Sequence, residues 1–166
     1  MKKKNIKLQL TDEEKKKLRT RKCRISDLWE MSAPEIETLL QVSSDRAREL
    51  RAFIEFQTVP SIGIRFAEDL IFLGYYSLDE LKSKDGARLV EDYERKKGYW
   101  IDPCVEDQFR LVVYAAGHSD CQKQWWDFTE ARKQYRAEQG YPADRPLTPW
   151  YEVIEIKSKK NIAGRT

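Results

Sequence analysis

The sequence predicts an all-α protein, and three observations support this fold class. Apolar residues recur every three or four positions in several stretches. Helix-start signals precede most of these stretches, and Gly74, Gly98 and Gly140 follow three of them as natural stops. Only residues 6–10 and 151–156 have a pattern that suits a strand. We therefore expect helices throughout, with short strands allowed only near the two ends.

The first helices are predicted from their start signals. Residues 11–14, Thr-Asp-Glu-Glu, form a capping box that begins a basic helix, which should end near Lys22. Residues 32–35 form a second capping box ahead of another apolar stretch. Ser44 or Asp45 is then placed to cap a third helix, whose apolar residues keep helical spacing as far as residue 54.

The same signals continue along the rest of the chain. Asp102-Pro103 is the strongest of them, because Asp accepts from free amides and Pro has no amide to lose. Asp120 is placed to cap a long final helix that includes Trp125 and Trp126. The proline-rich residues 141–149 cannot all be helical, and residues from 157 onward are expected to be disordered. Further helices are predicted over residues 67–74, 77–81 and 85–98.

Composition predicts one soluble domain with charged extensions. Charged residues make up 36% of the chain, and no apolar run approaches the roughly 18 residues that cross a membrane. The basic start lacks an apolar signal segment, and three cysteines do not form a disulfide framework, so we expect a cytoplasmic protein without membrane contact. The predicted parts are a basic N-terminal tail and helix (1–24), a helical domain (25–140) and a proline-rich, basic extension (141–166).

The net charge of +3 is unevenly distributed along the chain. Basic residues outnumber acidic ones by eight in residues 1–24 and by four in the last ten residues, which leaves −9 for residues 25–156. An acidic centre repels phosphate on average. Any attraction to a polyanion must therefore come largely from the ends of the chain.

Residues 59–63, Val-Pro-Ser-Ile-Gly, have the pattern of a helix-hairpin-helix turn. Glycine is expected in such a turn because its backbone takes left-handed angles and approaches a partner closely. Amides at the start of the next helix would hold a phosphate oxygen, Arg65 would add a charge-assisted bond, and no base would be read. Ile62 would also fill the core beneath the turn. The predicted phosphate-binding residues are Ser61, Ile62, Gly63, Ile64 and Arg65.

A shift of twenty residues aligns this turn with an earlier one. Val42 then matches Ile62, and Ser43 matches Gly63. Amphipathic helices also match at a few apolar positions by chance, which is the alternative explanation. The repeat predicts two hairpins in tandem, of which the first is degenerate and serves packing only, because residues 41–44 lack glycine.

Several motifs in and beyond the turn carry a resemblance to known proteins. The spacing Pro-x-apolar-Gly-x-x-x-Ala resembles the DNA-binding hairpins of repair proteins, polymerases and ligases, which usually have glycine in place of Ser61. The wider set resembles bacterial helix-hairpin-helix proteins of the pathogenicity-locus family, often labelled mitomycin-resistance proteins. This resemblance covers roughly residues 45–150 and implies a DNA-binding fold without an established reaction. Its motifs are residues 59–74, 76–81, 102–105, 109–115 and 125–128.

Other candidate sites carry less support. Cys104 lies near a predicted helix start, where a thiol pKa is lowered, but the single histidine, His118, is about 21 Å away along the helix, and a small buried residue is the alternative. His118 and Cys121 match no familiar zinc spacing. We predict no catalytic residue, no metal site and no cofactor. We interpret the acidic pairs as parts of solvated helix faces. These pairs are Glu68-Asp69, Asp92 with Glu94, and Glu106-Asp107.

Trp125 and Trp126 offer a different kind of contact, because tryptophans stack on unpaired bases and are favoured at protein interfaces. The leading hypothesis is a non-enzymatic protein that binds DNA independently of sequence through the hairpin turn, with the basic N-terminus adding affinity. The alternative is a protein-interaction or adaptor module that uses the helical scaffold and the Trp-rich helix to bind a protein partner. An enzyme that depends on Cys104 is the third hypothesis.

Overall fold

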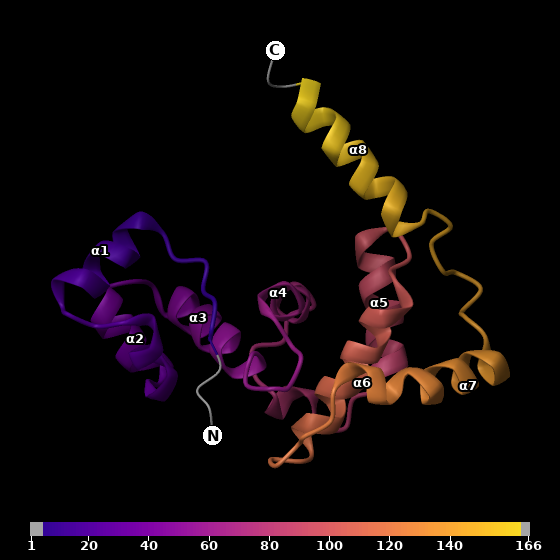
Figure 1. Cartoon of the computed structure of the whole chain (residues 1–166), viewed down its shortest axis with the longest axis horizontal. Coiled ribbons are helices and arrows are strands. Elements are labelled where there is room, and N and C mark those ends of the chain that lie inside the picture. Colours follow the sequence, from indigo (N-terminus) through magenta and orange to yellow (C-terminus); the bar gives the residue numbers. More distant parts are fainter. Residues whose placement is uncertain (1–4, 164–166) are drawn as a thin grey trace. The chain divides into compact units, whose positions relative to one another are not determined.

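Helices dominate the computed structural model, which describes the backbone of residues 5–163 and the side chains of residues 5–158 (Figure 1). The predicted all-α fold is confirmed, since the described residues form no sheet and only one isolated bridge, between Trp100 and Pro149. No helix in this part of the chain is long and apolar enough to cross a membrane. The α-helices are α1 (Asp12–Thr20), α2 (Ala33–Leu40), α3 (Ser44–Phe56), α4 (Ile64–Phe72), α5 (Gly86–Lys97), α6 (Pro103–Ala116), α7 (Thr129–Gln139) and α8 (Trp150–Ala163). The 3-10 helices are η1 (Ile25–Glu30), η2 (Asp79–Leu81) and η3 (Trp125–Phe128).

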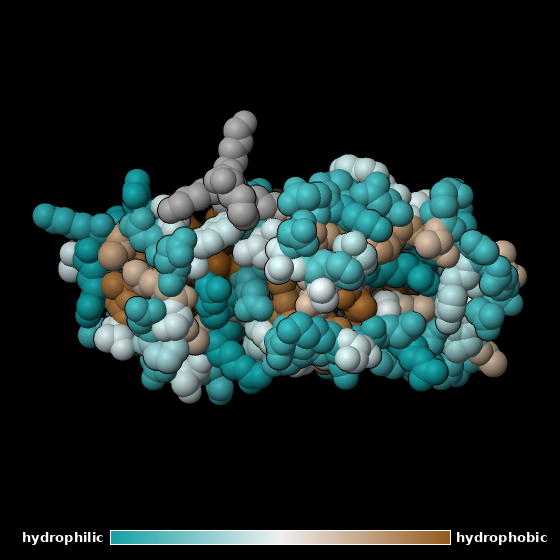
Figure 2. Space-filling view, turned by 90° about the horizontal axis from the view of Figure 1, so that it is seen from below, coloured by the Kyte–Doolittle hydropathy of each residue, from teal (hydrophilic) through white to brown (hydrophobic). Residues whose placement is uncertain are grey.

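The chain divides into two compact units. The first contains the residues up to Lys82 and the segment Tyr114–Gln122. The second contains Ser83–Val113 and the residues from Lys123 onward. Hydrophilic side chains cover most of the face seen in Figure 2, as expected for a chain with 36% charged residues. The predicted phosphate-binding turn belongs to the first unit.

The core of the first unit forms where α2 packs on α3. Ile36 and Leu40 of α2, and Ala47 and Leu50 of α3, are fully buried. Within each helix these positions lie three or four residues apart, so each helix turns one apolar face to the core. On either side, α1 packs on α2, and α4 packs on α3.

The segment before α1 is part of the same core. The strand allowed by the sequence over residues 6–10 does not form, and the backbone of Lys7 bonds a side chain instead of another strand. The Gln57 side chain donates from Nε2 to the Lys7 carbonyl oxygen (2.8 Å) and accepts at Oε1 from the Lys7 amide (3.1 Å). Ile6 and Leu10 are buried beside Leu18 of α1. Removal of these residues would therefore open the core.

Helix starts in this unit agree with the sequence signals, with one shift. The Thr11 hydroxyl accepts from the Glu14 amide (3.1 Å), and the Glu14 carboxylate accepts from the Thr11 amide (2.9 Å), so the predicted capping box is confirmed. Glu14 is buried and pairs with Arg46 of α3 at 2.9 Å. The hydrogen bond from Arg46 lowers the pKa of Glu14 below its ordinary value. The cap of α3 is Ser43, so the predicted cap at Ser44 or Asp45 is wrong by one or two residues.

The backbone of this unit repeats with the twenty-residue offset found in the sequence. Gln41 and Ser61 are both left-handed, with φ of 51° and 56°. Ser43 and Gly63 are the N-caps of α3 and α4, which begin at residues 44 and 64. α3 is therefore the second helix of one helix–turn–helix pair and the first helix of the next.

The second unit contains α5, α7, α8 and most of α6. The predicted long helix from Asp120 is wrong, because residues 117–124 form no helix and α7 begins at Thr129. The Asp127 carboxylate accepts from the Gln124 amide (2.8 Å) and so starts η3 instead. The strand expected over residues 151–156 does not form, because α8 continues through it. α8 also includes residues 157–163, which were expected to be disordered, whereas residues 164–166 lie outside the described residues.

Buried carboxylates in the second unit contradict the prediction of solvated acidic faces. Glu94, Glu106 and Asp107 are at most 1% exposed, and arginines pair with all three. Burial without such partners would be strongly unfavourable. The pairs are Glu94 with Arg145 (2.8 Å), Glu106 with Arg110 (2.9 Å) and Arg136 (3.0 Å), and Asp107 with Arg132 (2.7 Å).

Candidate functional site

The turn between α3 and α4 is fixed to the core from beneath. The Val59 amide donates to the Phe56 carbonyl oxygen (3.2 Å), and the Ile62 amide donates to the Val59 carbonyl oxygen (3.3 Å). Val59 and Ile62 are both buried, as predicted for Ile62. The Ile62 side chain is therefore buried, and its amide already has an acceptor, so the predicted phosphate donors that remain accessible lie after Ile62.

Glycine has a different role in this turn from the one predicted. The left-handed residue is Ser61, whereas Gly63 is extended, with φ of −108° and ψ of −179°. Any residue adopts these extended angles. A Cβ built at Gly63 would have no atom within 4 Å. Neither the backbone angles nor the internal packing of the turn require glycine at 63, and the missing side chain leaves the backbone accessible from outside.

The first turn of α4 presents amides without acceptors. No side chain caps this helix, and its first turn contains no acidic residue. The amides of Gly63, Ile64 and Arg65 have no hydrogen-bond acceptor among the described residues. The helix dipole adds to the partial positive charge of these groups. This end of α4 can therefore hold an anionic oxygen.

The preceding helices of the same unit carry a side-chain cap or an acidic residue at the corresponding end. Thr11 accepts from an amide of α1, and Ser43 accepts from an amide of α3. At α2 no side chain accepts from a first-turn amide, but Glu35 lies in the first turn, where its carboxylate accepts from the Ser32 amide at 2.7 Å and repels an anion. Among these four helices, α4 alone has neither a side-chain cap nor an acidic residue in its first turn.

Charges of both signs surround the open end of α4. Arg65 is exposed, and no described carboxylate lies within ion-pair distance of it. Glu68 and Asp69, in the same helix, are partly buried, and Glu68 accepts a hydrogen bond from Gln9. Attraction of an anion to this turn therefore depends on the amides and on Arg65 at short range.

Cys104 lacks the properties of a reactive thiol. Partial burial of the thiol and its hydrogen bond to Asp102 raise the pKa of Cys104, although the residue as a whole is exposed. The Asp102 carboxylate also accepts from the Cys104 amide (2.8 Å), so it occupies the helix start that would otherwise stabilise a thiolate. The interpretation of Cys104 as a buried core residue is wrong, and the raised pKa does not favour an activated nucleophile.

His118 and Cys121 do not form a metal centre in the structure. The His118 ring stacks on Tyr114, with ring centroids 3.9 Å apart, and its Nδ1 donates to the Tyr114 carbonyl oxygen (2.7 Å). Within the part of the chain that the structure describes, no three residues among His, Cys, Asp and Glu are grouped to hold a metal ion.

Trp125 and Trp126 lie on η3 and not on a long helix as predicted. Their rings meet edge to face, with centroids 5.4 Å apart. Trp126 is 54% exposed, whereas Trp125 is partly buried. Only Trp126 therefore offers a large accessible ring.

Sequence reasoning missed a second group of residues around the α2–α3 turn. The structure places Gln41 of that turn in an open cleft with basic side chains of α1. The twenty-residue repeat that aligns Gln41 with Ser61 was the available signal, but the missing glycine led to the prediction of a packing role only.

Comparison with known proteins identifies the family. A family model described as Cdd1, pathogenicity locus, matches residues 49–134, which is more than half of the chain. The chain belongs to the pathogenicity-locus family. The resemblance found in the sequence is thereby confirmed, and the matched part includes the α3–α4 turn but not α1 or the α2–α3 turn. No curated protein and no solved structure matches the chain.

Proposed function

We propose that this chain binds DNA without sequence preference and holds a backbone phosphate at the start of α4. The observation that carries the proposal is the uncapped helix end, where the amides of Gly63, Ile64 and Arg65 lack acceptors among the described residues. A phosphate oxygen there takes the place of the missing cap, and the Arg65 side chain adds a second positive group. Phosphates recur along every strand, so binding is independent of base sequence.

The shape of the turn supports the same proposal. Gly63 is extended, and a side chain there would meet no atom of the chain within 4 Å. Glycine also permits close approach of a ligand to the backbone, and this property is the one that phosphate binding uses. Ser61 adopts the left-handed angles that the turn needs. Serine in place of the usual glycine at this position therefore does not change the geometry of the turn.

The expected affinity is modest. Residues 25–156 carry a net charge of −9, so the general field of this region opposes binding. Sequence-independent contacts of this kind typically give dissociation constants of about 10⁻⁴ to 10⁻⁶ M at physiological salt. Binding should weaken steeply as salt rises, because each neutralised phosphate releases counterions.

Fluorescence anisotropy of labelled duplex and single-stranded DNA tests the proposal with the intact chain and a Gly63→Val variant. The variant should keep its thermal unfolding midpoint, because the structure has space for the side chain. Its affinity should fall by at least about fivefold, because the branched side chain separates the phosphate from the amides, which loses roughly 1 kcal/mol or more. Absence of binding by the intact chain at low salt would refute the proposal, as would unchanged binding by the folded variant.

The role of the basic N-terminus must be tested by substitution and not by truncation. A chain that starts at Ile25 would lack Ile6, Leu10 and Leu18, which are buried in the core of the first unit. Loss of binding by such a fragment would report loss of structure. Charge-removing substitutions on the exposed side of α1 avoid this effect.

A protein-interaction module is the second candidate function, and exposed apolar side chains of the second unit favour it. Trp126, Tyr151 and Ile154 are 54%, 49% and 53% exposed. Large apolar side chains of this kind are favoured at protein interfaces. A protein partner that stays bound at high salt, and that Trp126→Ala weakens, would support this function. Unchanged DNA binding by the same variant would separate it from the first proposal.

A further inference from the structure

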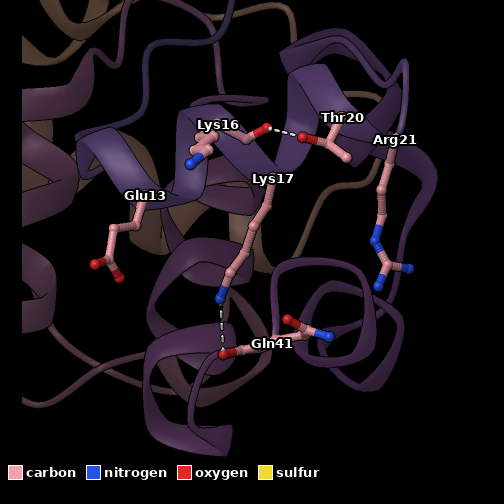
Figure 3. A pocket seen from close by; sticks show the side chains of 6 residues that line it. All are labelled: Glu13, Lys16, Lys17, Thr20, Arg21 and Gln41. Carbon is pink, nitrogen blue, oxygen red and sulfur yellow. Dashed lines mark hydrogen bonds between the residues drawn. The ribbon is translucent and has the colours of Figure 1, made fainter.

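A second concentration of positive charge lies beside the α2–α3 turn. One side of α1 and this turn line an open cleft of about 470 Å³. The cleft carries three basic residues and one acidic residue, so its lining has a net charge of +2. Its lining residues are Glu13, Lys16, Lys17, Thr20, Arg21 and Gln41 (Figure 3).

Two of these basic side chains converge on the turn. Lys17 lies in the last turn of α1 and Arg21 directly follows the helix as its C-cap, and both side chains extend toward Gln41 in Figure 3. The Lys17 ammonium donates to the Gln41 carbonyl oxygen at 3.3 Å. This bond positions Lys17 and leaves two of its three N–H donors for another group.

The basic side chains of the cleft form no direct ion pair with a described carboxylate. Among the described residues, no carboxylate lies within ion-pair distance of Lys16, Lys17 or Arg21. By contrast, Lys15 of the same helix pairs with Asp12 at 3.7 Å. Like charges one turn apart on a helix repel each other, so an anion placed between Lys17 and Arg21 relieves an unfavourable interaction.

We propose that this cleft takes a second phosphate of a nucleic-acid backbone, an inference that rests on the proposed DNA binding. The α2–α3 turn is the twenty-residue counterpart of the α3–α4 turn, but its helix end is closed by Ser43. The side chains of Lys17 in α1 and of Arg21, just after α1, therefore supply the donors that free amides supply at α4. Arg21 offers a planar pair of donors that fits phosphate, and Lys17 offers a compact charge.

A charge-matched pair of variants tests this site in the full chain. Lys17→Gln/Arg21→Gln removes two positive charges one turn apart that line the cleft, and Lys15→Gln/Arg19→Gln removes two from the same helix outside it. We expect the cleft variant to bind duplex DNA about tenfold more weakly, with a salt slope smaller by about one. The affinity of the control variant for duplex DNA should fall by about two- to threefold, because only the general electrostatic field of the chain is reduced. Equal losses by the two variants would overturn the cleft site and leave DNA binding at α4 intact.

Titration of the full-length chain with inorganic phosphate separates this inference from the proposed function. Amide NMR signals of Gln41 and Thr20 should shift with phosphate in the intact chain and in Gly63→Val, but not in Lys17→Gln/Arg21→Gln. Such shifts in a protein that fails to bind DNA would refute the nucleic-acid partner and restrict the cleft to free phosphate. Absence of shifts at Gln41 and Thr20 would overturn the anion site itself.

Discussion

Replacement of Gly63 with aspartate would separate the stability of α4 from its proposed role in binding. Gly63→Asp places a carboxylate at the N-cap, where it accepts hydrogen bonds from the amides of the first turn. The site is extended and open, with no atom within 4 Å of a Cβ, so the new side chain enters without a clash. The carboxylate takes the position that we assign to a phosphate oxygen.

The two effects of this substitution can be estimated separately. An aspartate cap and its charge near the helix start should add about 0.5–1 kcal/mol to the free energy of unfolding. Two negative charges 5 Å apart repel by about 3 kcal/mol at an effective dielectric constant of 20, and by about 1 kcal/mol in water. Affinity for DNA should therefore fall by about 5- to 150-fold. Stability and binding move in opposite directions, which a general disruption of the fold would not produce.

Urea unfolding followed by circular dichroism measures the first effect, and anisotropy with duplex DNA measures the second. Gly63→Ser is the matched control, because its neutral hydroxyl caps α4 without adding charge. We expect the control to gain a few tenths of a kcal/mol in stability and to lose much less affinity than the aspartate variant. If Gly63→Asp is stabilised yet binds DNA as tightly as the intact chain, the phosphate does not bind at α4 and the reasoning is wrong.

Three further substitutions test other features of the two units. Ser61→Gly should raise the free energy of unfolding by about 0.5–1 kcal/mol, because Ser61 is left-handed (φ 56°); an unchanged urea midpoint would count against that conformation. Gly86→Ala should lower the free energy of unfolding by about 1–3 kcal/mol, because the new Cβ would lie 2.9 Å from Cα of Arg110. Calorimetry that finds the variant as stable as the unsubstituted chain would contradict this packing. Glu14→Gln should lower the free energy of unfolding at pH 7, and the difference in stability between the variant and the unsubstituted chain should shrink as the pH falls below about 4.5. The hydrogen bond from Arg46 lowers the folded-state pKa of Glu14, so its stabilisation is lost on acidification; a difference independent of pH would rule this out.

Short-range signals predicted the helices of the first unit well. The capping box at residues 11–14 is confirmed because both of its hydrogen bonds join residues three positions apart, so the sequence contains the whole interaction. Asp120 is also a residue type that caps helices, but the residues after it offer no continuous apolar face. A 3-10 helix begins at residue 125 instead. A cap signal therefore predicts a helix only when the next turns also pack.

Long-range partners explain the predictions that failed. Alternating Ile6, Leu8 and Leu10 indicated a strand, since alternation suits any extended segment with one buried side. The actual partner is Gln57, fifty residues away. The local sequence spacing also predicted a solvated Asp107, but the ion pair with Arg132, twenty-five residues later, makes burial of Asp107 possible. Neither partner could be assigned from sequence spacing.

The candidate site combines a predictable turn with an unpredictable electrostatic environment. Residues 59–63 indicated the turn, and buried Ile62 holds it to the core, but the role of Gly63 depends on angles that the sequence did not specify. Serine at position 61 takes the left-handed angles, which leaves glycine at 63 for backbone access. A pattern match that counts glycines alone would rank this turn as a poor phosphate site. The proposed phosphate site rests instead on the open amides of the first turn of α4, which do not depend on the number of glycines.

The two repeated turns, taken together, lead to a quantitative expectation for salt dependence. If the α4 end and the α1 cleft each neutralise one phosphate, the slope of log affinity against log salt should be about −1.8 for duplex DNA. The two sites use different donors, backbone amides in one and the side chains of Lys17 and Arg21 in the other. Substitution at either site should then remove about half of the slope, and substitution at both should remove nearly all of it. Since residues 25–156 carry a net charge of −9, the field of this region does not replace these local contacts.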